Sequence, residues 1–196
     1  MFKRKIEKEL LNWKNNLSFN RKAFILKGLR QVGKTYIVSK FAKENYENVA
    51  YINFKLDPNK KECFKEAGNV DSLILNISSK MKDVHFIPNK TVLIFDEIQE
   101  CSAARASIKS FMEDGRFDII ATGSLLGIKG YNKKYSGGVS VGYEHTVYMK
   151  AMDFEEFGNL NNNEINSISQ VFLNRVQEPL HIYLYNNKDA PFYLYP

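Results

Sequence analysis

Short apolar segments alternate with helical apolar patterns between residues 2 and 158. Segments rich in apolar, β-branched and aromatic residues predict strands. The predicted strands are Ala23–Lys27, Val49–Phe54, Thr91–Phe95, Phe117–Ala121 and Tyr143–Lys150. The third of these is apolar at successive positions, a pattern typical of a strand that is buried on both faces of a parallel sheet.

Apolar residues that recur three and four positions apart predict the helices between these strands. The predicted helices are Phe2–Asn15, Thr35–Asn45 and Ser102–Glu113, with two short helices within residues 59–84. Asp71 and Ser72 predict the start of the second short helix, because both residue types cap helix N-termini. The alternation of strand and helix predicts an α/β fold, with a mostly parallel sheet covered by helices on both faces.

The pattern weakens toward the end of the chain. Residues 123–142 are rich in Gly, Ser, Lys and Tyr and predict a long loop. Asp153, followed three residues later by Glu156, fits a variant of the capping box that starts a short helix. Residues 159–163 include four Asn. We therefore assign residues 1–158 to one domain and expect residues 159–196 to form a truncated or mobile extension.

The composition is that of an ordinary globular protein, with 44% hydrophobic and 26% charged residues. No apolar segment is long enough to cross a bilayer, so no membrane partner is expected. Residues 1–7 lack the apolar stretch of a signal peptide, which favours the cytoplasm. Cys63 and Cys101 have the spacing of neither a zinc site nor a disulfide framework.

Positive charge is concentrated in residues 1–40, which contain eleven basic and two acidic side chains, a net of +9 against +6 for the whole chain. This pattern favours a solvated basic helix face together with an anion site. A nucleic-acid surface is left open but is not indicated, because no basic stripe interleaved with aromatic residues accompanies the charge.

One segment between the first predicted strand and the second predicted helix matches the pattern G-x-x-x-x-G-K-[ST]. It consists of Gly28, Leu29, Arg30, Gln31, Val32, Gly33, Lys34 and Thr35. The glycines allow backbone conformations in which the loop N–H groups form a cradle for phosphate at a helix N-terminus. Lys34 can reach the outer phosphates of ATP, and the Thr35 hydroxyl can ligate Mg²⁺.

A second motif follows the third predicted strand, where Val92–Phe95 is succeeded by Asp96 and Glu97. The carboxyl end of such a strand delivers side chains to the crevice in which ligands bind. Asp96 is expected to orient Mg²⁺, and Glu97 to polarise a water for attack on the γ-phosphate. An apolar run before two acids is common, but about sixty residues after a phosphate loop it favours function.

Polar residues also follow the fourth predicted strand. Thr122 is our first candidate for a contact with the γ-phosphate or the attacking water, and Ser124 is the second. An ordinary strand-end turn explains Thr122–Ser124 equally well, since Thr, Gly and Ser all favour turns. Gln99 either hydrogen-bonds near the phosphates or merely starts the next helix.

The chain resembles the N-terminal ATPase domain of bacterial and archaeal AAA-superfamily ATP-binding proteins that carry a C-terminal domain of unknown function. The matching stretches are GLRQVGKT at 28–35, VAYINF at 49–54, LIFDEIQ at 93–99, EDGRFDIIATGSLLG at 113–127 and VGYEHTVYMKAMDFEEF at 141–157. The resemblance implies a P-loop NTPase of the additional-strand type with a five-stranded sheet in the order 5-1-4-3-2. It also implies that Thr122 lies near the γ-phosphate.

Two features differ from the pattern of these relatives. Many of them continue through a helical region and the C-terminal domain, whereas this sequence reaches Pro196. They also often carry an Arg before the fifth strand, where it acts on a neighbour's phosphate, and residues 117–150 contain none. Arg105 and Arg116 lie just upstream, but an ordinary solvated position is favoured for both.

The sequence thus predicts an ATPase domain that binds ATP and Mg²⁺ and hydrolyses ATP slowly, with ADP as product. The alternative is a nucleotide-gated interaction module whose partner is another protein or a second copy in a homo-oligomer. A small-molecule kinase is less favoured. Such kinases close an Arg-rich lid over the phosphates, and the basic residues of the loop at 123–142 are only Lys129, Lys133 and Lys134.

Overall fold

The computed structural model describes residues 4–65, 69–124, 142–153 and 156, and Arg4–Met152 form one compact unit. Five parallel strands of this unit make a single sheet in the order β2-β3-β4-β1-β5. The strands are β1 (Ala23–Gly28), β2 (Asn48–Asn53), β3 (Thr91–Asp96), β4 (Asp118–Ser124) and β5 (Glu144–Met149). This arrangement confirms the predicted α/β class, and it confirms the order 5-1-4-3-2 because β4 lies between β1 and β3.

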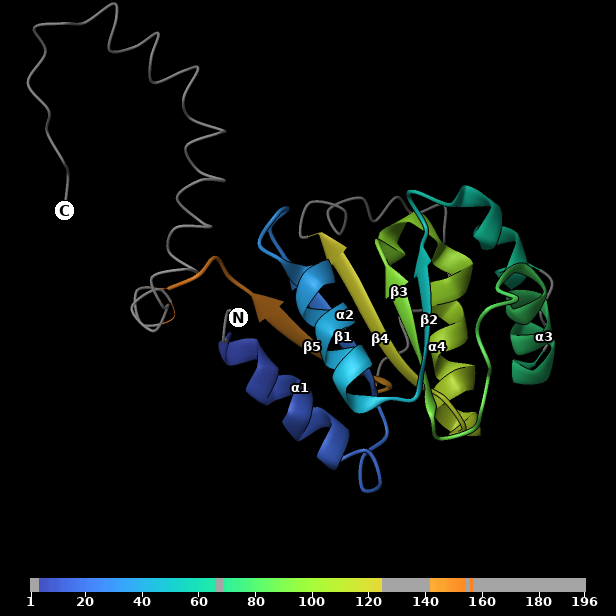
Figure 1. Ribbon diagram of the computed structural model, residues 1–196, viewed down its shortest axis with the longest axis horizontal. Coiled ribbons are helices and arrows are strands. Elements are labelled where there is room, and N and C mark those ends of the chain that lie inside the picture. Colours follow the sequence, from blue (N-terminus) through green and yellow to red (C-terminus); the bar gives the residue numbers. More distant parts are fainter. Residues whose placement is uncertain (1–3, 66–68, 125–141, 154–155, 157–196) are drawn as a thin grey trace, which may run out of the picture. The chain divides into compact units, whose positions relative to one another are not determined.

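Helices cover both faces of the sheet, as predicted (Figure 1). The helical elements are α1 (Lys5–Asn15), α2 (Lys34–Asn45), the 3-10 helix η1 (Pro58–Phe64), α3 (Val70–Lys80), the 3-10 helix η2 (Ile98–Glu100) and α4 (Ser102–Asp114). Side chains of α1 and α2 pack on one face, and those of η1, α3, η2 and α4 pack on the other.

The alternation of side chains along β3 decides which residues meet which helices. Val92 and Ile94 belong to the core under α1 and α2, whereas Leu93 and Phe95 belong to the core under α3 and α4. Asp96, two positions beyond Ile94, therefore lies on the α2 face. All six residues of β3 are buried, as the unbroken apolar run predicted.

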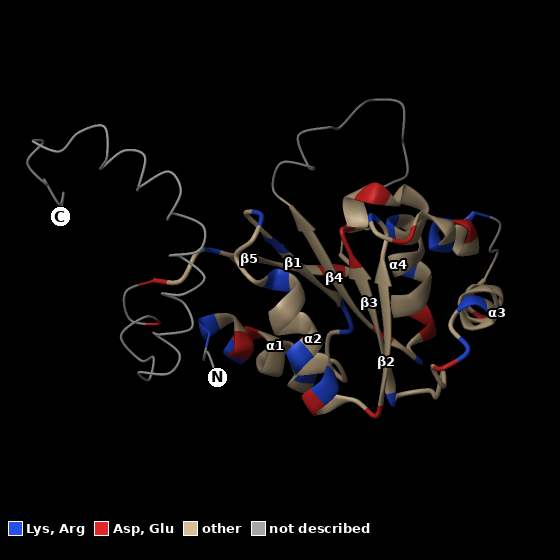
Figure 2. Ribbon diagram, turned by 45° about the horizontal axis from the view of Figure 1, so that its top comes forward, with Lys and Arg blue, Asp and Glu red and all other residues tan. Residues whose placement is uncertain are grey.

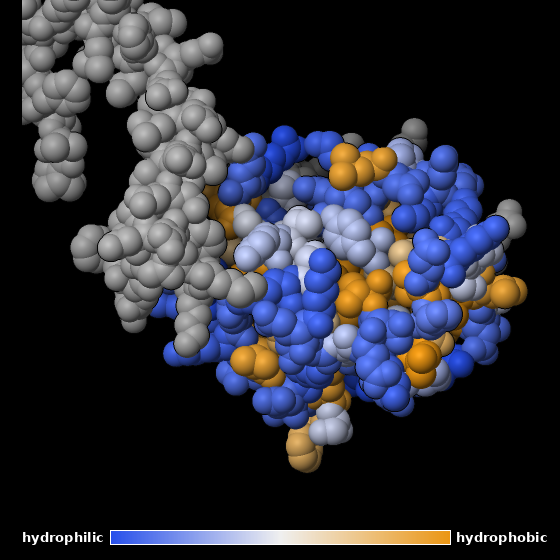
Figure 3. Space-filling view, viewed as in Figure 1, coloured by the Kyte–Doolittle hydropathy of each residue, from blue (hydrophilic) through white to orange (hydrophobic). Residues whose placement is uncertain are grey.

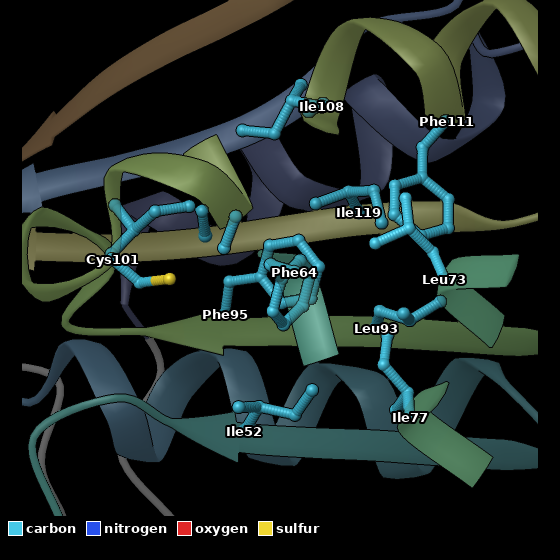
Figure 4. Close-up of a cluster of buried hydrophobic side chains, with 14 of the residues drawn as sticks. Ile52, Phe64, Leu73, Ile77, Leu93, Phe95, Cys101, Ile108, Phe111 and Ile119 are labelled. Carbon is cyan, nitrogen blue, oxygen red and sulfur yellow. The ribbon is translucent and has the colours of Figure 1, made fainter. Parts of the chain in front are cut away.

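Aromatic packing fixes the end of β3 directly before Asp96. The ring of Phe95 lies 5.7 Å from that of Phe54, 5.4 Å from that of Phe64 and 6.3 Å from that of Phe111, measured between centroids (Figure 4). These tilted and edge-on contacts contribute beyond the burial of apolar area. The backbone that presents Asp96 is thus anchored from the opposite face of the sheet.

Most boundaries differ from those predicted by one to three residues, and two of the differences have a clear physical reason. The second short helix starts at Val70, and Asn69 rather than Asp71 or Ser72 caps it, because Asn69 Oδ1 accepts from the Ser72 N–H at 2.9 Å. β4 begins at Asp118 and continues through Ser124, since Gly28 of β1 pairs with Ser124. The residue types at 122–124 favour turns, but pairing with β1 overrides that local preference.

The carboxyl ends of β1 and β5 approach each other closely at Gly28. A Cβ at this position would lie 2.4 Å from the carbonyl oxygen of Met149. We therefore expect Gly28→Ala to lower the free energy of unfolding by about 1–3 kcal/mol, the usual cost of overpacking. Thermal or denaturant unfolding measures the change, and a variant as stable as the wild type would contradict this close approach.

The surface of the described residues is mostly hydrophilic on the face drawn in Figure 3, with apolar side chains in separate patches. None of the described helices combines the length and apolar character that crossing a membrane requires.

Separately, the backbone N–H of Asp153 donates to Glu156 Oε2, and the backbone N–H of Glu156 donates to Asp153 Oδ1, as in the predicted capping box. The predicted loop beyond Ser124 and the predicted extension at 159–196 lie outside the described residues.

Candidate functional site

The polar residues singled out in the sequence gather where three neighbouring strands end. Gly28 ends β1, Asp96 ends β3 and Ser124 ends β4, and these strands are parallel neighbours. Carboxyl ends of parallel strands lie at one edge of a sheet, and α2 starts there because it follows β1 by a short loop. The geometry therefore brings the loop 28–35 to the end of β3.

The two motifs contact each other through Thr35 and Asp96, although 61 residues separate them. Thr35 Oγ1 lies 3.2 Å from Asp96 Oδ1 and 3.1 Å from Asp96 Oδ2. Thr122 Oγ1 also donates to Asp96 Oδ1. The Asp96 side chain is buried, as is Thr122. A carboxylate in this position is held by hydroxyl groups from the start of α2 and from β4.

Lys34 is the first residue of α2, and its ammonium group lies against its own loop. Nζ donates to the carbonyl oxygens of Gly28 at 3.2 Å and Leu29 at 2.6 Å. Burial lowers the pKa of Lys34, the carboxylates of Glu97 and Asp96 oppose this effect, and Arg30 adds to it. The ammonium group is therefore within electrostatic reach of both acids.

The backbone at the site adopts conformations that side chains seldom allow. Gly33, which precedes α2, has a φ of 93°, Gln31 a φ of 64° and Glu97 a φ of 54°. Strained non-glycine residues concentrate at functional sites, where the surrounding structure holds them in place. The first turn of α2 contains no acidic residue, so its N–H groups and Lys34 favour an anion.

Glu97 is held by its neighbour Gln99. Gln99 lies in η2 between β3 and α4, and its Nε2 donates to Glu97 Oε2. A Cβ on Gly123 would lie 3.0 Å from Gln99 Oε1, so the glycine leaves room for this amide beside β4. Gln99 lies in the short helical turn that precedes α4, and its side chain also contacts a candidate site residue. The structure therefore agrees with both interpretations of Gln99 made from the sequence.

Sequence reasoning missed two side chains of β2. Tyr51 Oη donates to Asp96 Oδ2 at 2.6 Å, and Asn53 Nδ2 donates to the same oxygen at 2.9 Å. Burial and the bond to Asp96 raise the pKa of Tyr51 to about 12, so the phenol remains a donor at neutral pH. The signal in the sequence was polar Asn53 at the end of a predicted strand that neighbours β3.

Both arginines considered as groups acting on a neighbour's phosphate pair with acids of their own chain. Arg105 pairs with Glu144 at 3.2 Å, which ties α4 to β5. Arg116 pairs with Asp71 and Asp114, each at 2.7 Å. Both guanidinium groups are partly exposed, as an ordinary surface position predicts, and each has an acidic partner.

The basic excess of residues 1–40 is partly neutralised within the domain. Arg21 pairs with Asp118 at 2.7 Å, which offsets one charge of the excess, whereas Lys40 pairs at 3.0 Å with Glu7, an acid already counted in it. Figure 2 shows basic and acidic residues mixed along α1 and α2. Arg4 donates to the carbonyl oxygens of Val32 at 3.2 Å and Lys150 at 2.9 Å, and so links the loop to the end of β5.

The donor set at Thr35 and Asp96 fits Mg²⁺, which is bound in proteins by one or two carboxylates together with substrate phosphates and water. Both residues offer oxygen atoms, and they already lie within 3.2 Å of each other. Within the described ranges, no group of three or more His, Cys, Asp or Glu side chains could enclose a metal by protein ligands alone. A magnesium ion here would therefore depend on phosphate oxygens.

Comparisons with known proteins identify the family of the chain and support its fold. A family model described as an AAA domain matches residues 20–158. No curated protein matches the chain.

Two of the solved structures that are similar to the chain illustrate the likeness. One is the ORC2 protein of Aeropyrum pernix in ADPNP–ADP complexes, with a TM-score of 0.52 and 16% identity, which covers 78% of this chain and 49% of that one. The other is the Walker-type ATPase PABY2304 of Pyrococcus abyssi, with a TM-score of 0.47 and 19% identity, which covers 80% and 55%. The chain thus spans about half the length of these proteins, and the first likeness supports the fold.

Proposed function

This chain belongs to the AAA domain family, and from that premise we propose that it binds Mg-ATP and hydrolyses it slowly. The observation that carries the proposal is the contact of Thr35 with both oxygens of Asp96. Two motifs that are distant in sequence meet there in the order and geometry that a nucleotide site requires. ORC2 of Aeropyrum pernix, which shares the fold, was solved with ADPNP and ADP, and we extend nucleotide binding to this chain.

In this proposal the loop 28–35 surrounds the phosphates with backbone N–H groups, and Lys34 turns from the carbonyl oxygens of Gly28 and Leu29 to phosphate oxygens. Thr35 and Asp96 hold Mg²⁺, which neutralises charge on the β- and γ-phosphates when bound. Ser124, buried at the end of β4 opposite Gly28, lines the same edge.

Hydrolysis requires a water in line with the γ-phosphorus. Glu97 accepts a proton from this water while the water oxygen bonds to the γ-phosphorus. The bond between the γ-phosphorus and the β–γ bridging oxygen breaks, which yields ADP and phosphate. The Thr122 hydroxyl orients the γ-phosphate or the attacking water. Lys34 and the loop amides offset the charge that develops in the transition state.

One observation favours an alternative in which nucleotide binding is a signal and hydrolysis is negligible. Gln99 donates to Glu97 Oε2, so the candidate base is already engaged by a neighbouring amide. In this alternative a protein partner or a second copy of the chain responds to bound ATP. Turnover measured with and without such a partner separates the two functions.

We expect the isolated wild-type chain to bind Mg-ATP in calorimetry and to release phosphate more slowly than the usual enzyme median of about ten per second. The low rate follows from the engaged Glu97 and from the absence of any activating partner in the assay. Heat of binding that is indistinguishable from buffer would contradict nucleotide binding. Turnover at or above that median would contradict slow hydrolysis.

A further inference from the structure

Two side chains of β2 form a closed hydrogen-bond network with Asp96. Tyr51 Oη and Asn53 Nδ2 both donate to Asp96 Oδ2, at 2.6 and 2.9 Å. Asn53 Nδ2 also donates to Tyr51 Oη at 3.2 Å. Each of the three groups thus contacts the other two, which restricts the rotation of all three side chains.

The register of the sheet creates this network. Asn53 lies opposite Asp96, and Tyr51 lies opposite Ile94, in the parallel pair of β2 and β3. Residues two apart on a strand share a face, so Tyr51 and Asn53 both lie on the side of the sheet that α2 covers. Ala50 and Ile52, which alternate with them, are buried in the opposite core.

The network distinguishes the two oxygens of Asp96. A carboxylate oxygen accepts about two hydrogen bonds, and Oδ2 receives two from β2. The Thr35 hydroxyl lies 3.1 Å from Oδ2 and 3.2 Å from Oδ1, and Oδ1 also accepts from Thr122. The Thr35 hydroxyl can donate its proton to Asp96 while its lone pair remains directed elsewhere. The bonds from β2 therefore fix the orientation of the Asp96 carboxylate beside the Thr35 hydroxyl.

We propose that Tyr51 and Asn53 are positioning residues for Mg²⁺, which fix the Asp96 carboxylate beside the Thr35 hydroxyl so that both groups can face the metal. This inference rests on the proposed function, because it assigns a role to two residues of the same nucleotide site. Groups that orient metal ligands typically contribute 10–100-fold to metal affinity. The β2 strand thus takes part in nucleotide binding through its hydrogen bonds alone.

Tyr51→Phe is the cleanest test, since it removes one hydroxyl and keeps the ring. Asn53 is less suitable because its Oδ1 also accepts from the backbone N–H groups of Lys55 at 3.0 Å and Leu56 at 2.9 Å. Tyr46→Phe is a matched control. Tyr46 Oη donates to Asp118 Oδ2 at 2.8 Å, an equivalent bond at the opposite end of the sheet, where β4 begins.

The experiment measures ATP affinity of the full chain by calorimetry with EDTA and with saturating Mg²⁺, alongside thermal unfolding. We expect Mg²⁺ to tighten ATP binding by the wild type and by Tyr46→Phe to the same extent. In Tyr51→Phe this tightening should fall about tenfold, while affinity in EDTA stays within about twofold of wild type. A purely structural role would weaken binding equally with and without the metal.

Each other outcome has a defined meaning. If Tyr51→Phe responds to Mg²⁺ as the wild type does, or loses affinity equally in EDTA, the inference is overturned and the proposed function stands. If Tyr46→Phe loses the response to Mg²⁺ to the same degree, the effect is not local to Asp96 and the inference is also overturned. A wild type that binds no ATP, or whose binding ignores Mg²⁺, overturns the proposed metal site and the inference with it.

Discussion

Lys34→Ala should abolish measurable ATP binding while it leaves the fold intact. The ammonium group now donates to two loop carbonyl oxygens, and in the proposed complex it turns to phosphate oxygens. A hydrogen bond to a charged group contributes about 1.5–3 kcal/mol, so loss of such bonds to phosphate should weaken binding at least about a hundredfold. Calorimetry with Mg-ATP measures the affinity, and circular dichroism with thermal unfolding tests the fold.

Lys43→Ala provides a matched control on the same helix. Lys43 is exposed in the last turn of α2, at the end away from the loop, so its removal should leave ATP affinity unchanged. The same charge change at two ends of one helix separates a local effect from a general loss of positive charge. A folded Lys34→Ala protein that binds ATP as tightly as the wild type would remove the basis for the phosphate-loop assignment.

Local patterns predicted the helices and strands of this domain and their α/β alternation. The unbroken apolar run of β3 predicted its burial on both faces, and all six residues of the strand are buried. The order of the sheet was a different matter. It came from the resemblance to a family, since alternation of strands and helices is compatible with several strand orders. Periodicity therefore predicted the elements, and the resemblance to a family predicted their arrangement.

Features that depend on pairing between distant segments could not be read from local patterns. β4 extends through Ser124 because Gly28 pairs with it, although the residues concerned favour turns. The roles of Tyr51 and Asn53 depend on the register between β2 and β3, which places Asn53 opposite Asp96. The sequence could not show that Asn69, and not Asp71, caps the helix, because both residue types can cap. Only the backbone geometry distinguishes them, and Asn69 Oδ1 accepts from the Ser72 N–H.

The contacts around Asp96 and Glu97 also show why adjacent acids need not act alike. Asp96 is buried and receives hydroxyl and amide donors from β2, α2 and β4, which suits a fixed metal ligand. Glu97 is only partly buried, has a left-handed backbone and contacts the side chain of Gln99. A residue at the strand end that is less tightly enclosed is better placed to meet a water.

Glu97→Gln should bind ATP within about twofold of the wild type yet hydrolyse it at least about tenfold more slowly. The substitution keeps the length of the side chain, and its amide oxygen can still accept from Gln99, so the local structure should persist. It removes the base that accepts the proton of the attacking water, a contribution of roughly 10²–10⁴-fold in enzymes where that step limits the rate. Steady-state phosphate release and calorimetry measure the two effects.

Glu100→Gln is the corresponding control, because Glu100 is an exposed acid three residues further along, whose nearest cation is Lys61 at 4.0 Å. It carries the same change in charge and should hydrolyse ATP at the wild-type rate. Equal turnover by Glu97→Gln and wild type would show that Glu97 is not the base. If wild-type turnover is already at the background rate, both variants will match it, and the Glu97–Gln99 contact then supports the nucleotide-gated module over the ATPase.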